Sequence, residues 1–181
     1  MADFHKADIE KLIDGVLPWP ATQDMLNSPK DTDRFDKYVE IMQARVDFDD
    51  PILLPLTPRL FIVASKDAGR VVKCKCGHSF GDYRVNWKLS ALINVRDDEA
   101  SMSEVYRERE MPDPTWTQLR EYICNGCGAQ LEAEAVPRGC PPDFEFLPDL
   151  DTFYSDWLGR PLPDTVAFED NTLDRVKEWS K

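Results

Sequence analysis

Two stripes of apolar residues at helical spacing lie in the first quarter of the chain. The first stripe is Ile9, Leu12, Ile13 and Val16, and the second is Phe35, Tyr38, Val39, Met42 and Val46. Apolar residues three and four positions apart share one face of an α-helix, so each stripe predicts a helix with a buried face. Pro29 and Asp31 suit a first helical turn, because Pro needs no hydrogen-bond donor there and Asp meets the positive end of the helix dipole. Residues 1–50 are therefore predicted to form a helical N-terminal arm.

The pattern changes after residue 50, where closely spaced prolines interrupt any helix. Residues 60–64 form a short apolar run and residues 66–70 have the composition of a turn, which together predict a β-hairpin over residues 60–73. Residues 119–123 and 131–136 alternate apolar with polar positions. Such alternation is typical of a half-buried strand, so we expect a strand in each of these two segments.

Shorter helices are predicted in the rest of the chain. Residues 97–106 are expected to form a helix inserted into a β-rich domain that spans residues 51–140. Residues 151–158 predict a short helix that ends at Gly159, and the remainder of residues 141–181 is expected to be an irregular, acidic C-terminal extension with a marginal final helix. With the N-terminal arm, these elements predict the α+β fold class.

The charge balance narrows the classes of partner. Among 181 residues, 22 are Lys or Arg and 34 are Asp or Glu, so the net charge of −12 repels nucleic-acid phosphates and anionic lipids. Hydrophobic residues make up 42% of the chain, which is enough for a folded core. The first residues carry no signal-peptide pattern, and no apolar run approaches the roughly 20 residues that span a bilayer. We expect a cytoplasmic protein with no nucleic-acid or membrane partner.

The tryptophans allow two interpretations. Those considered are Trp19, Trp87, Trp116 and Trp157. Large aromatic side chains dominate both protein cores and protein interfaces. We expect each of these tryptophans to pack in the core, with a role as an interface anchor as the alternative.

Four of the five cysteines fall into two short clusters. Cys74 and Cys76 form the first, and Cys124 and Cys127 form the second after 47 intervening residues. The cytosol keeps thiols reduced, so these cysteines are better explained as metal ligands or buried thiols than as disulfides. Two short chelating pairs brought together by a fold are a common way of holding structural zinc. The four cysteines are therefore the predicted ligands of one structural Zn²⁺, at the centre of a zinc-ribbon-like arrangement of β-hairpins.

The residues around the two pairs leave some alternatives open. Gly77 and Gly128 each follow the second cysteine of a pair, where a tight turn often needs positive φ and directs N–H groups at sulfur. The first pair has the tighter Cys-x-Cys spacing, so His78 is a rival ligand to Cys74, and unmetallated buried thiols are a third possibility. Cys140, followed by two prolines, is expected to be a spare thiol.

A closed shell of four sulfurs has no position for water or substrate, so the metal would stabilise the fold and not catalyse a reaction. The sequence contains no zinc-protease, deaminase, phosphate-loop or nucleophile-elbow motif. His5 and His78 are the two histidines, which nearly excludes histidine acid–base chemistry. We predict no catalytic and no organic cofactor-binding residues. A nucleic-acid-associated zinc ribbon and an independent metalloenzyme with an open metal site are the competing functions.

Longer stretches of the sequence resemble a known family. The stretches are residues 25–31, 38–41, 53–63, 76–80, 86–89, 95–97, 120–124 and 153–159. On these residues the chain resembles the gamma subunit of acetone carboxylase, a family that includes the corresponding subunit of acetophenone carboxylase. Two features depart from the acetone enzymes: Gly81 stands where those enzymes often have a further cysteine, and the tail after Pro161 is longer. The resemblance therefore does not assign a particular ketone.

The resemblance implies a role that spacing and composition do not show. It implies a biotin-independent, ATP-dependent carboxylase that converts a ketone, such as acetone or acetophenone, and bicarbonate to a 3-oxo acid. In that family the nucleotide and ketone sites lie on two larger, hydantoinase-like subunits, and the small subunit carries zinc and helps to hold the complex together. Cys74, Cys76, Cys124 and Cys127 match the family's cysteine-rich segments.

Overall fold

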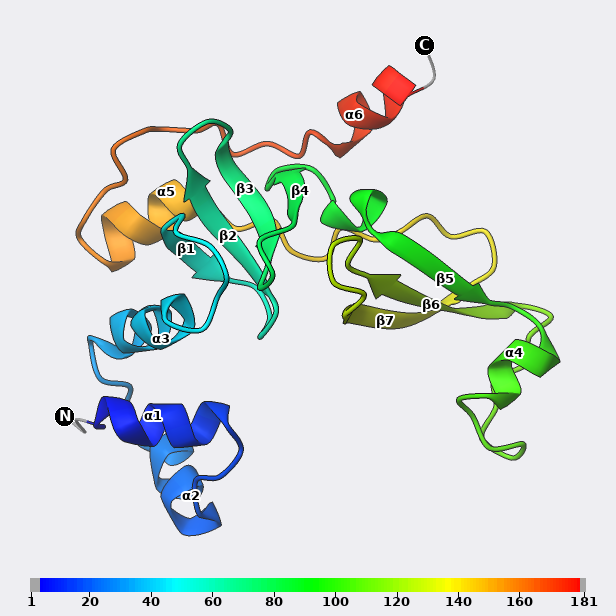
Figure 1. The fold of residues 1–181 in the computed structure, drawn as a ribbon, viewed down its shortest axis with the longest axis horizontal. Helices are drawn as coiled ribbons and strands as arrows, with labels where there is room; N and C mark the ends of the chain where they lie inside the picture. Colours follow the sequence, from blue (N-terminus) through cyan, green and yellow to red (C-terminus); the bar gives the residue numbers. More distant parts are fainter. Residues whose placement is uncertain (1–3, 180–181) are drawn as a thin grey trace.

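The computed structural model describes residues 4–179, which contain helices at the N-terminus, two antiparallel sheets and a C-terminal segment that returns along the first sheet (Figure 1). The N-terminal helices are α1 (Lys6–Ile13), α2 (Trp19–Asn27) and α3 (Arg34–Gln43). The strands of the first sheet are β1 (Ile52–Pro55), β2 (Leu60–Ser65), β3 (Gly69–Cys74) and β4 (Ser79–Asp82), in that order. The strands of the second are β5 (Leu92–Arg96), β6 (Thr117–Ile123) and β7 (Gln130–Pro137). The α+β prediction is confirmed.

The helical N-terminal arm forms a small core of its own. Ile9, Met25 and Ile41, one from each helix, are buried against one another. The first predicted stripe is nevertheless too long, because α1 ends at Ile13 and Val16 is exposed. Gly15, with φ of +69°, turns the chain away from the helix axis before Val16 is reached.

The first sheet is built around the predicted hairpin of β2 and β3. Leu60 pairs with Cys74 and Ser65 with Gly69, so the first cysteine ends the hairpin as expected. Both faces of β2 are buried: Phe61 packs on the side of α3, and Ile62 packs on the side that meets the C-terminal segment. A strand covered on both faces has the continuous apolar pattern seen in this part of the sequence.

The second sheet confirms the two alternating segments as β6 and β7 and adds β5, which the sequence did not indicate. The inserted helix α4 (Glu99–Ser103) is shorter than predicted. Asp98 caps its N-terminus by accepting a hydrogen bond from the N–H of Ser101 at 2.7 Å, and Met102 is fully buried. Val105, predicted to continue the helix, is exposed beyond its last turn.

The C-terminal segment contains α5 (Leu150–Thr152), the π-helical turn η2 (Phe153–Trp157) and α6 (Thr172–Trp179). The predicted helix over residues 151–158 is thus present, and Gly159 follows it with φ of +64°. Tyr154 fastens this segment to β1 by donating a hydrogen bond to the carbonyl of Leu53 at 2.8 Å. No helix among residues 4–179 has both the length and the apolar character needed to cross a bilayer.

One hydrophobic cluster joins the two sheets to the C-terminal segment. It includes Cys74 of the first sheet, Cys124 and Tyr122 of the second, and Leu150 and Tyr154 of the C-terminal segment. Cys74 and Cys124 are therefore part of the main core. The division into segments 1–50, 51–140 and 141–181 as separate domains stays a prediction.

The tryptophans do not follow the core prediction. Trp87, in the 3-10 helix η1 (Trp87–Ser90), is buried, but Trp19, Trp116 and Trp157 are exposed. Each exposed tryptophan lies at the end of an element or in a turn, where no second layer of structure covers it. Core packing was therefore the wrong expectation for these three side chains.

Candidate metal centre

The two cysteine pairs meet where the two sheets touch. Cys74 ends β3 and Cys76 lies in the turn to β4, whereas Cys124 follows β6 and Cys127 lies in the turn to β7. The four Sγ atoms all lie within 4.8 Å of one another. The Sγ atoms of Cys74 and Cys127 are 3.9 Å apart, and those of Cys76 and Cys124 are 3.7 Å apart.

These distances suit a single tetrahedral metal ion. A zinc–sulfur bond of about 2.3 Å implies sulfur–sulfur edges of about 3.8 Å in a regular tetrahedron. The two measured separations fall on either side of this value. The four sulfurs can therefore hold a divalent metal that prefers thiolates.

The backbone of each turn is organised by the cysteine-glycine pattern. Gly77 has φ of +88° and Gly128 has φ of +71°, so the predicted positive φ is present at both positions. The N–H of Cys74 donates to the carbonyl of His78 at 2.8 Å, and the N–H of Cys124 donates to the carbonyl of Ala129 at 2.9 Å. The two turns are thus closed by equivalent hydrogen bonds.

The turns also touch each other through Gly126. A Cβ atom added at Gly126 would lie 2.8 Å from the Cβ of His78 and 3.4 Å from the Sγ of Cys76, so only glycine fits without displacement. The N–H of Gly126 also points at the Sγ of Cys124 at 3.4 Å. The ring of His78 packs edge-on against Phe80, with centroids 5.1 Å apart. Within residues 4–179, the compact group of metal-ligating atoms contains four sulfurs and no imidazole nitrogen.

The centre is buried on one side and open on the other. Cys74 and Cys124 are fully buried, Cys76 is partly buried and Cys127 is exposed. Burial raises the pKa of the Cys74 and Cys76 thiols, whereas the N–H of Ala129 lowers the pKa of Cys127. A bound cation would favour the thiolate form at the two buried positions. The predicted spare thiol, Cys140, is exposed and does not belong to the sulfur group.

A second cluster of ionisable groups was missed by sequence reasoning. The carboxylates of Glu132, Glu134 and Glu145 lie within 4.8 Å of one another, but the ammonium of Lys88 stands among them. Its Nζ is 2.6 Å from Glu132 and 3.2 Å from each of the other two carboxylates, and its side chain is only 2% exposed. The cluster is therefore a buried ion-pair network already occupied by a cation.

The alternation of residues in β7 does not predict this network. Glu132 and Glu134 face inward and are partly buried, whereas Ala133 between them and Ala135 after them are exposed. This is the reverse of the usual rule that apolar residues face the core. The only sequence signal is the pair of glutamates two positions apart. A lysine can be buried beside them only if the fold brings its distant segment close enough to form ion pairs.

The network extends onto β6. Lys88 lies over the ring of Tyr122, 5.1 Å from its centroid, and the hydroxyl of Tyr122 donates a hydrogen bond to Glu134. Arg120 also contacts Glu134, at 3.3 Å. Burial alone would lower the pKa of Lys88, but the three carboxylates outweigh it and hold that pKa above its ordinary value. Lys88 is therefore charged at neutral pH.

Comparisons with known proteins place the chain in a family. The sequence model of the family described as acetone carboxylase gamma subunit matches residues 46–158, which include all four clustered cysteines. The acetone carboxylase gamma subunit of Xanthobacter autotrophicus is 43% identical over 162 residues, which are 89% of this chain and 96% of the relative. The acetophenone carboxylase beta subunit of Aromatoleum aromaticum is 28% identical over 79 residues, which are 42% of this chain and 61% of the relative. Because the likeness to the first relative runs through nearly the whole of both chains, this protein belongs to the acetone carboxylase gamma subunit family.

Proposed function

We propose that this chain is the noncatalytic, zinc-binding gamma subunit of a biotin-independent, ATP-dependent ketone carboxylase. The complete enzyme would join bicarbonate to a ketone, acetone or an aryl ketone such as acetophenone, to give a 3-oxo acid. The single observation that carries the proposal is the 43% identity to an acetone carboxylase gamma subunit over 89% of the chain. The partners would be two larger, hydantoinase-like subunits that hold the nucleotide and the ketone, in a complex located in the cytoplasm.

The proposed zinc ligands are Cys74, Cys76, Cys124 and Cys127. The sulfur separations of 3.7 and 3.9 Å support this assignment over the alternative in which His78 replaces Cys74. When bound, zinc would join a turn of the first sheet to a turn of the second and add folding free energy. Structural zinc sites bind with roughly 10–16 kcal/mol, which is comparable with the whole stability of a domain, about 5–15 kcal/mol.

The charge distribution supports a role without catalysis and without nucleic acid. In the second ionisable cluster, Lys88 neutralises part of the carboxylate charge and fills the space that a metal ion would need. The net charge of −12 opposes the competing function of a nucleic-acid-associated zinc ribbon. Immobilised DNA and RNA should retain no protein at low salt.

Reconstitution tests the proposed function directly. The tagged chain is co-expressed with the two hydantoinase-like subunits encoded by its host, and the purified material is assayed for ATP hydrolysis with and without ketone. We expect both larger subunits to co-purify and the complex to hydrolyse ATP faster when ketone is present. The chain alone should show no hydrolysis. A folded, zinc-loaded chain that elutes alone as a monomer from such a co-expression would overturn the proposal.

Metal analysis tests the zinc assignment with a matched pair of cysteine variants. The wild-type chain should contain about one equivalent of zinc, and Cys127→Ala should lose most of it, because three thiolates leave the shell open. Cys140→Ala removes an exposed cysteine outside the sulfur group and should keep the full metal content. His78→Ala should also keep it. Zinc well below one equivalent in the wild type, or full zinc in Cys127→Ala, would refute the four-sulfur site.

A further inference from the structure

Large apolar side chains are exposed along the C-terminal segment. They are Phe146, Trp157, Phe168, Leu173 and Val176. Trp157 is 79% exposed and Leu173 is 72% exposed. The burial of large apolar side chains such as these is strongly favourable, so their exposure to water is unfavourable. Soluble monomers seldom expose several such groups on one segment unless the segment binds something. The C-terminal face, meaning the surface formed by residues 141–179, is therefore a candidate interaction surface.

The C-terminal face contains an apolar groove with ordered walls. The groove has a volume of about 380 Å³ and is lined by Leu54, Phe146, Leu147, Pro148, Asp149, Leu150, Thr152, Phe153 and Trp157. The ring of Phe153 packs edge-on against Phe35 of α3, with centroids 5.0 Å apart, and Trp157 tilts against Phe153 at 6.1 Å. These ring contacts fix the positions of two aromatic side chains in the groove wall. A preformed pocket flanked by aromatic side chains is the usual setting of an interface hot spot.

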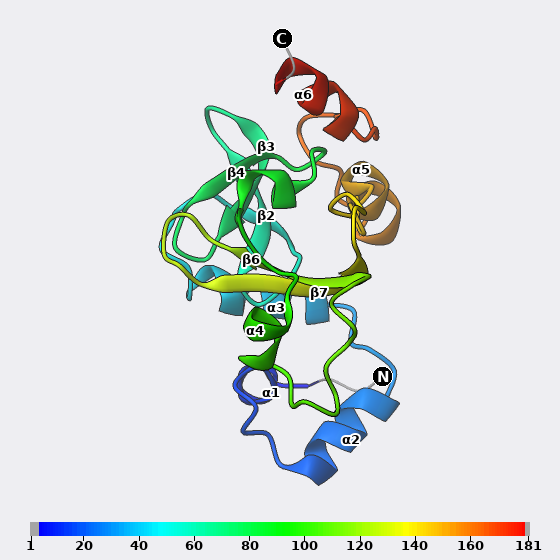
Figure 2. The same cartoon turned by 90° about the vertical axis from the view of Figure 1, so that its right-hand side faces the viewer.

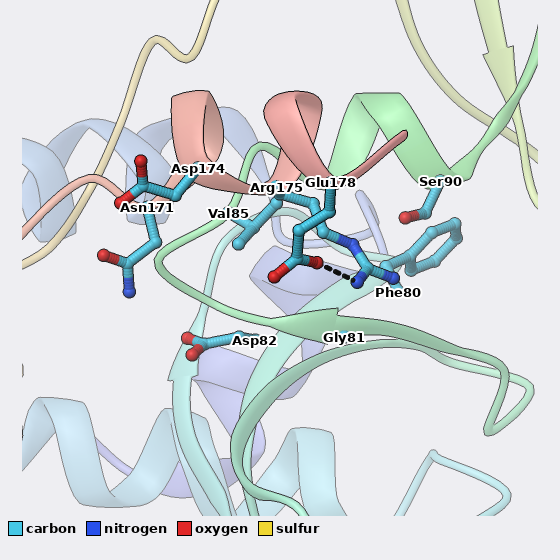
Figure 3. A pocket seen from close by; sticks show the side chains of 9 residues that line it. All are labelled: Phe80, Gly81, Asp82, Val85, Ser90, Asn171, Asp174, Arg175 and Glu178. Carbon is cyan, nitrogen blue, oxygen red and sulfur yellow. Dashed lines mark hydrogen bonds and ion pairs between the residues drawn. The ribbon is translucent and has the colours of Figure 1, made fainter. Parts of the chain in front are cut away.

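The final helix presents its apolar side outward. The polar residues Asp174, Arg175 and Glu178 of α6 line an open cavity against β4, where they stay more than half exposed, and Figure 3 shows Arg175 and Glu178 paired on this side. Leu173 and Val176 are exposed. A surface helix of a monomer normally has the opposite orientation, with its apolar stripe on the protein.

The position of α6 is held by the chain that precedes it. The N–H of Asn171 donates to the carbonyl of Arg84 at 2.9 Å, and the hydroxyl of Thr172 accepts from the N–H of Asn86 at 3.0 Å. The first turn of the helix is thus tied to the body. Because the polar side of the helix faces the cavity, Leu173 and Val176 stay available to another molecule.

The charge of the C-terminal face indicates what kind of partner could bind it. Residues 141–179 contain ten acidic and three basic residues, so they carry −7 of the total charge of −12. The segment follows one side of the molecule from the end of β7 past α5 to α6 (Figure 2). A second copy of this chain would place the same acidic surface opposite itself, and an anionic membrane would also repel it. A protein surface with apolar pockets surrounded by Lys and Arg would complement both the exposed apolar side chains and the acidic charge of residues 141–179.

We infer that the C-terminal face binds a basic, apolar-pocketed surface of one of the larger carboxylase subunits, with Trp157 as its central anchor. The inference rests on the proposed function for the identity of the partner. The groove, the outward stripe of α6 and the acidic charge would form one interface along residues 141–179. The C-terminal face would then be the binding surface, and the zinc-binding turns would stabilise the contact between the two sheets.

Binding to the purified larger subunits tests the inference with a pair of tryptophan variants. Trp157→Ala should weaken binding by about tenfold or more, as expected for an aromatic hot spot. Trp116→Ala, which removes a similarly exposed tryptophan outside the C-terminal face, should change the dissociation constant by less than about twofold. Zinc content and circular dichroism of both variants establish that they are folded.

A second pair of variants tests the charge complementarity. Asp156→Lys with Glu169→Lys reverses two charges on the C-terminal face, and should slow association by about fivefold or more at low salt. The same change at Glu108 and Glu110, which lie in the loop after α4, should have little effect. The difference between the two pairs should shrink at high salt, because the steering field is screened.

The outcomes separate the two proposals. If the wild-type chain binds neither larger subunit, the proposed function fails. If the wild-type chain binds and Trp157→Ala binds equally well, or Trp116→Ala is impaired to the same degree, only the inference about this surface is overturned. A wild-type chain that is dimeric by sedimentation and becomes monomeric in Trp157→Ala would identify a second copy as the occupant and would also overturn it.

Discussion

Replacement of Lys88 by methionine tests the buried ion-pair network most sharply. Methionine keeps the length of the lysine stem and its packing over Tyr122 but removes the charge. The ammonium lies 2.6 Å from Glu132, 3.2 Å from Glu134 and 3.2 Å from Glu145. The variant therefore leaves three carboxylates where one cation previously paired with all of them.

The three carboxylates would respond differently to this loss. Glu145 is more than half exposed and can turn its charge toward water. Glu134 keeps the hydroxyl of Tyr122 and the guanidinium of Arg120. Glu132 is mostly buried, and Lys88 is its ion-pair partner. Removing one member of a buried pair costs about 3–5 kcal/mol, and because one of the three carboxylates is stranded we expect about 3 kcal/mol.

Urea unfolding of the zinc-loaded chain, followed by tryptophan fluorescence, measures this loss of stability. Adding Glu132→Gln to Lys88→Met should recover at least about 1 kcal/mol, because the stranded charge is removed. Lys66→Met, in the exposed turn between β2 and β3, is the control and should stay within about 0.5 kcal/mol of the wild type.

The pH dependence follows from the pKa of Glu132. Burial raises this pKa, and Lys88 opposes the increase. Without Lys88 the folded-state pKa rises further above the unfolded value, so the native state holds a proton that the unfolded state releases. Stability is then lost as the pH rises through the folded pKa. The deficit of Lys88→Met should be larger at pH 8 than at pH 5.

A deficit below about 1 kcal/mol at pH 8 would refute the reasoning, because it would mean that the network contributes little net stability. An equal deficit at pH 5 and pH 8 would show that lost packing, and not the stranded carboxylate, causes the effect. If Lys88→Met with Glu132→Gln is less stable than Lys88→Met alone, the charge of Glu132 is also not the cause of the deficit.

Two further predictions concern the N-terminal arm and the metal turns. Burial alone would raise the pKa of Asp31, but hydrogen bonds from Arg34 and Lys37 outweigh it and lower the pKa to about 2. Asp31→Asn should therefore cost about 2 kcal/mol at pH 7, measured by urea unfolding, and the difference from wild type should disappear as the pH falls from 5 toward 2. A loss that persists at pH 2 would contradict this account. Gly126→Ala should raise the zinc dissociation constant at least about tenfold in competition with a chelator, because the new methyl group would meet His78 at 2.8 Å and push the turns apart. Unchanged zinc affinity would show that the turns tolerate the shift.

Most of the regular structure that the sequence predicted has a local cause. Apolar spacing identified α1 and α3, and the apolar run with its turn identified the hairpin of β2 and β3. Strands β1, β4 and β5 were not predicted. β1 and β4 are only four residues long, and Pro55 ends β1. β5 contains Leu92, Ile93 and Val95, but it is a five-residue segment that leaves these side chains exposed. In the fold, β2, β3 and β6 supply the antiparallel partners of β1, β4 and β5.

The grouping of the four cysteines could be predicted because it depends on residue type and short-range spacing. Cysteines in close pairs, each followed by a glycine, restrict both the ligand and the turn that presents it. The spacing did not decide between Cys74 and His78, because that choice depends on which atom faces the second pair. In the fold, the backbone of Cys74 bonds to that of His78 and the imidazole turns to Phe80, so the sulfur faces the other turn.

By itself, the sequence determined the helical and β-rich regions, the cysteine pairs, the acidic charge and the family. The tertiary structure alone decided that Lys88 is buried among carboxylates of a distant strand and that Trp157 is exposed beside a groove. The physical reason is the range of the forces involved. Propensity, capping and chelate spacing act over a few residues, whereas burial and ion pairing depend on which remote segments the folded chain brings together.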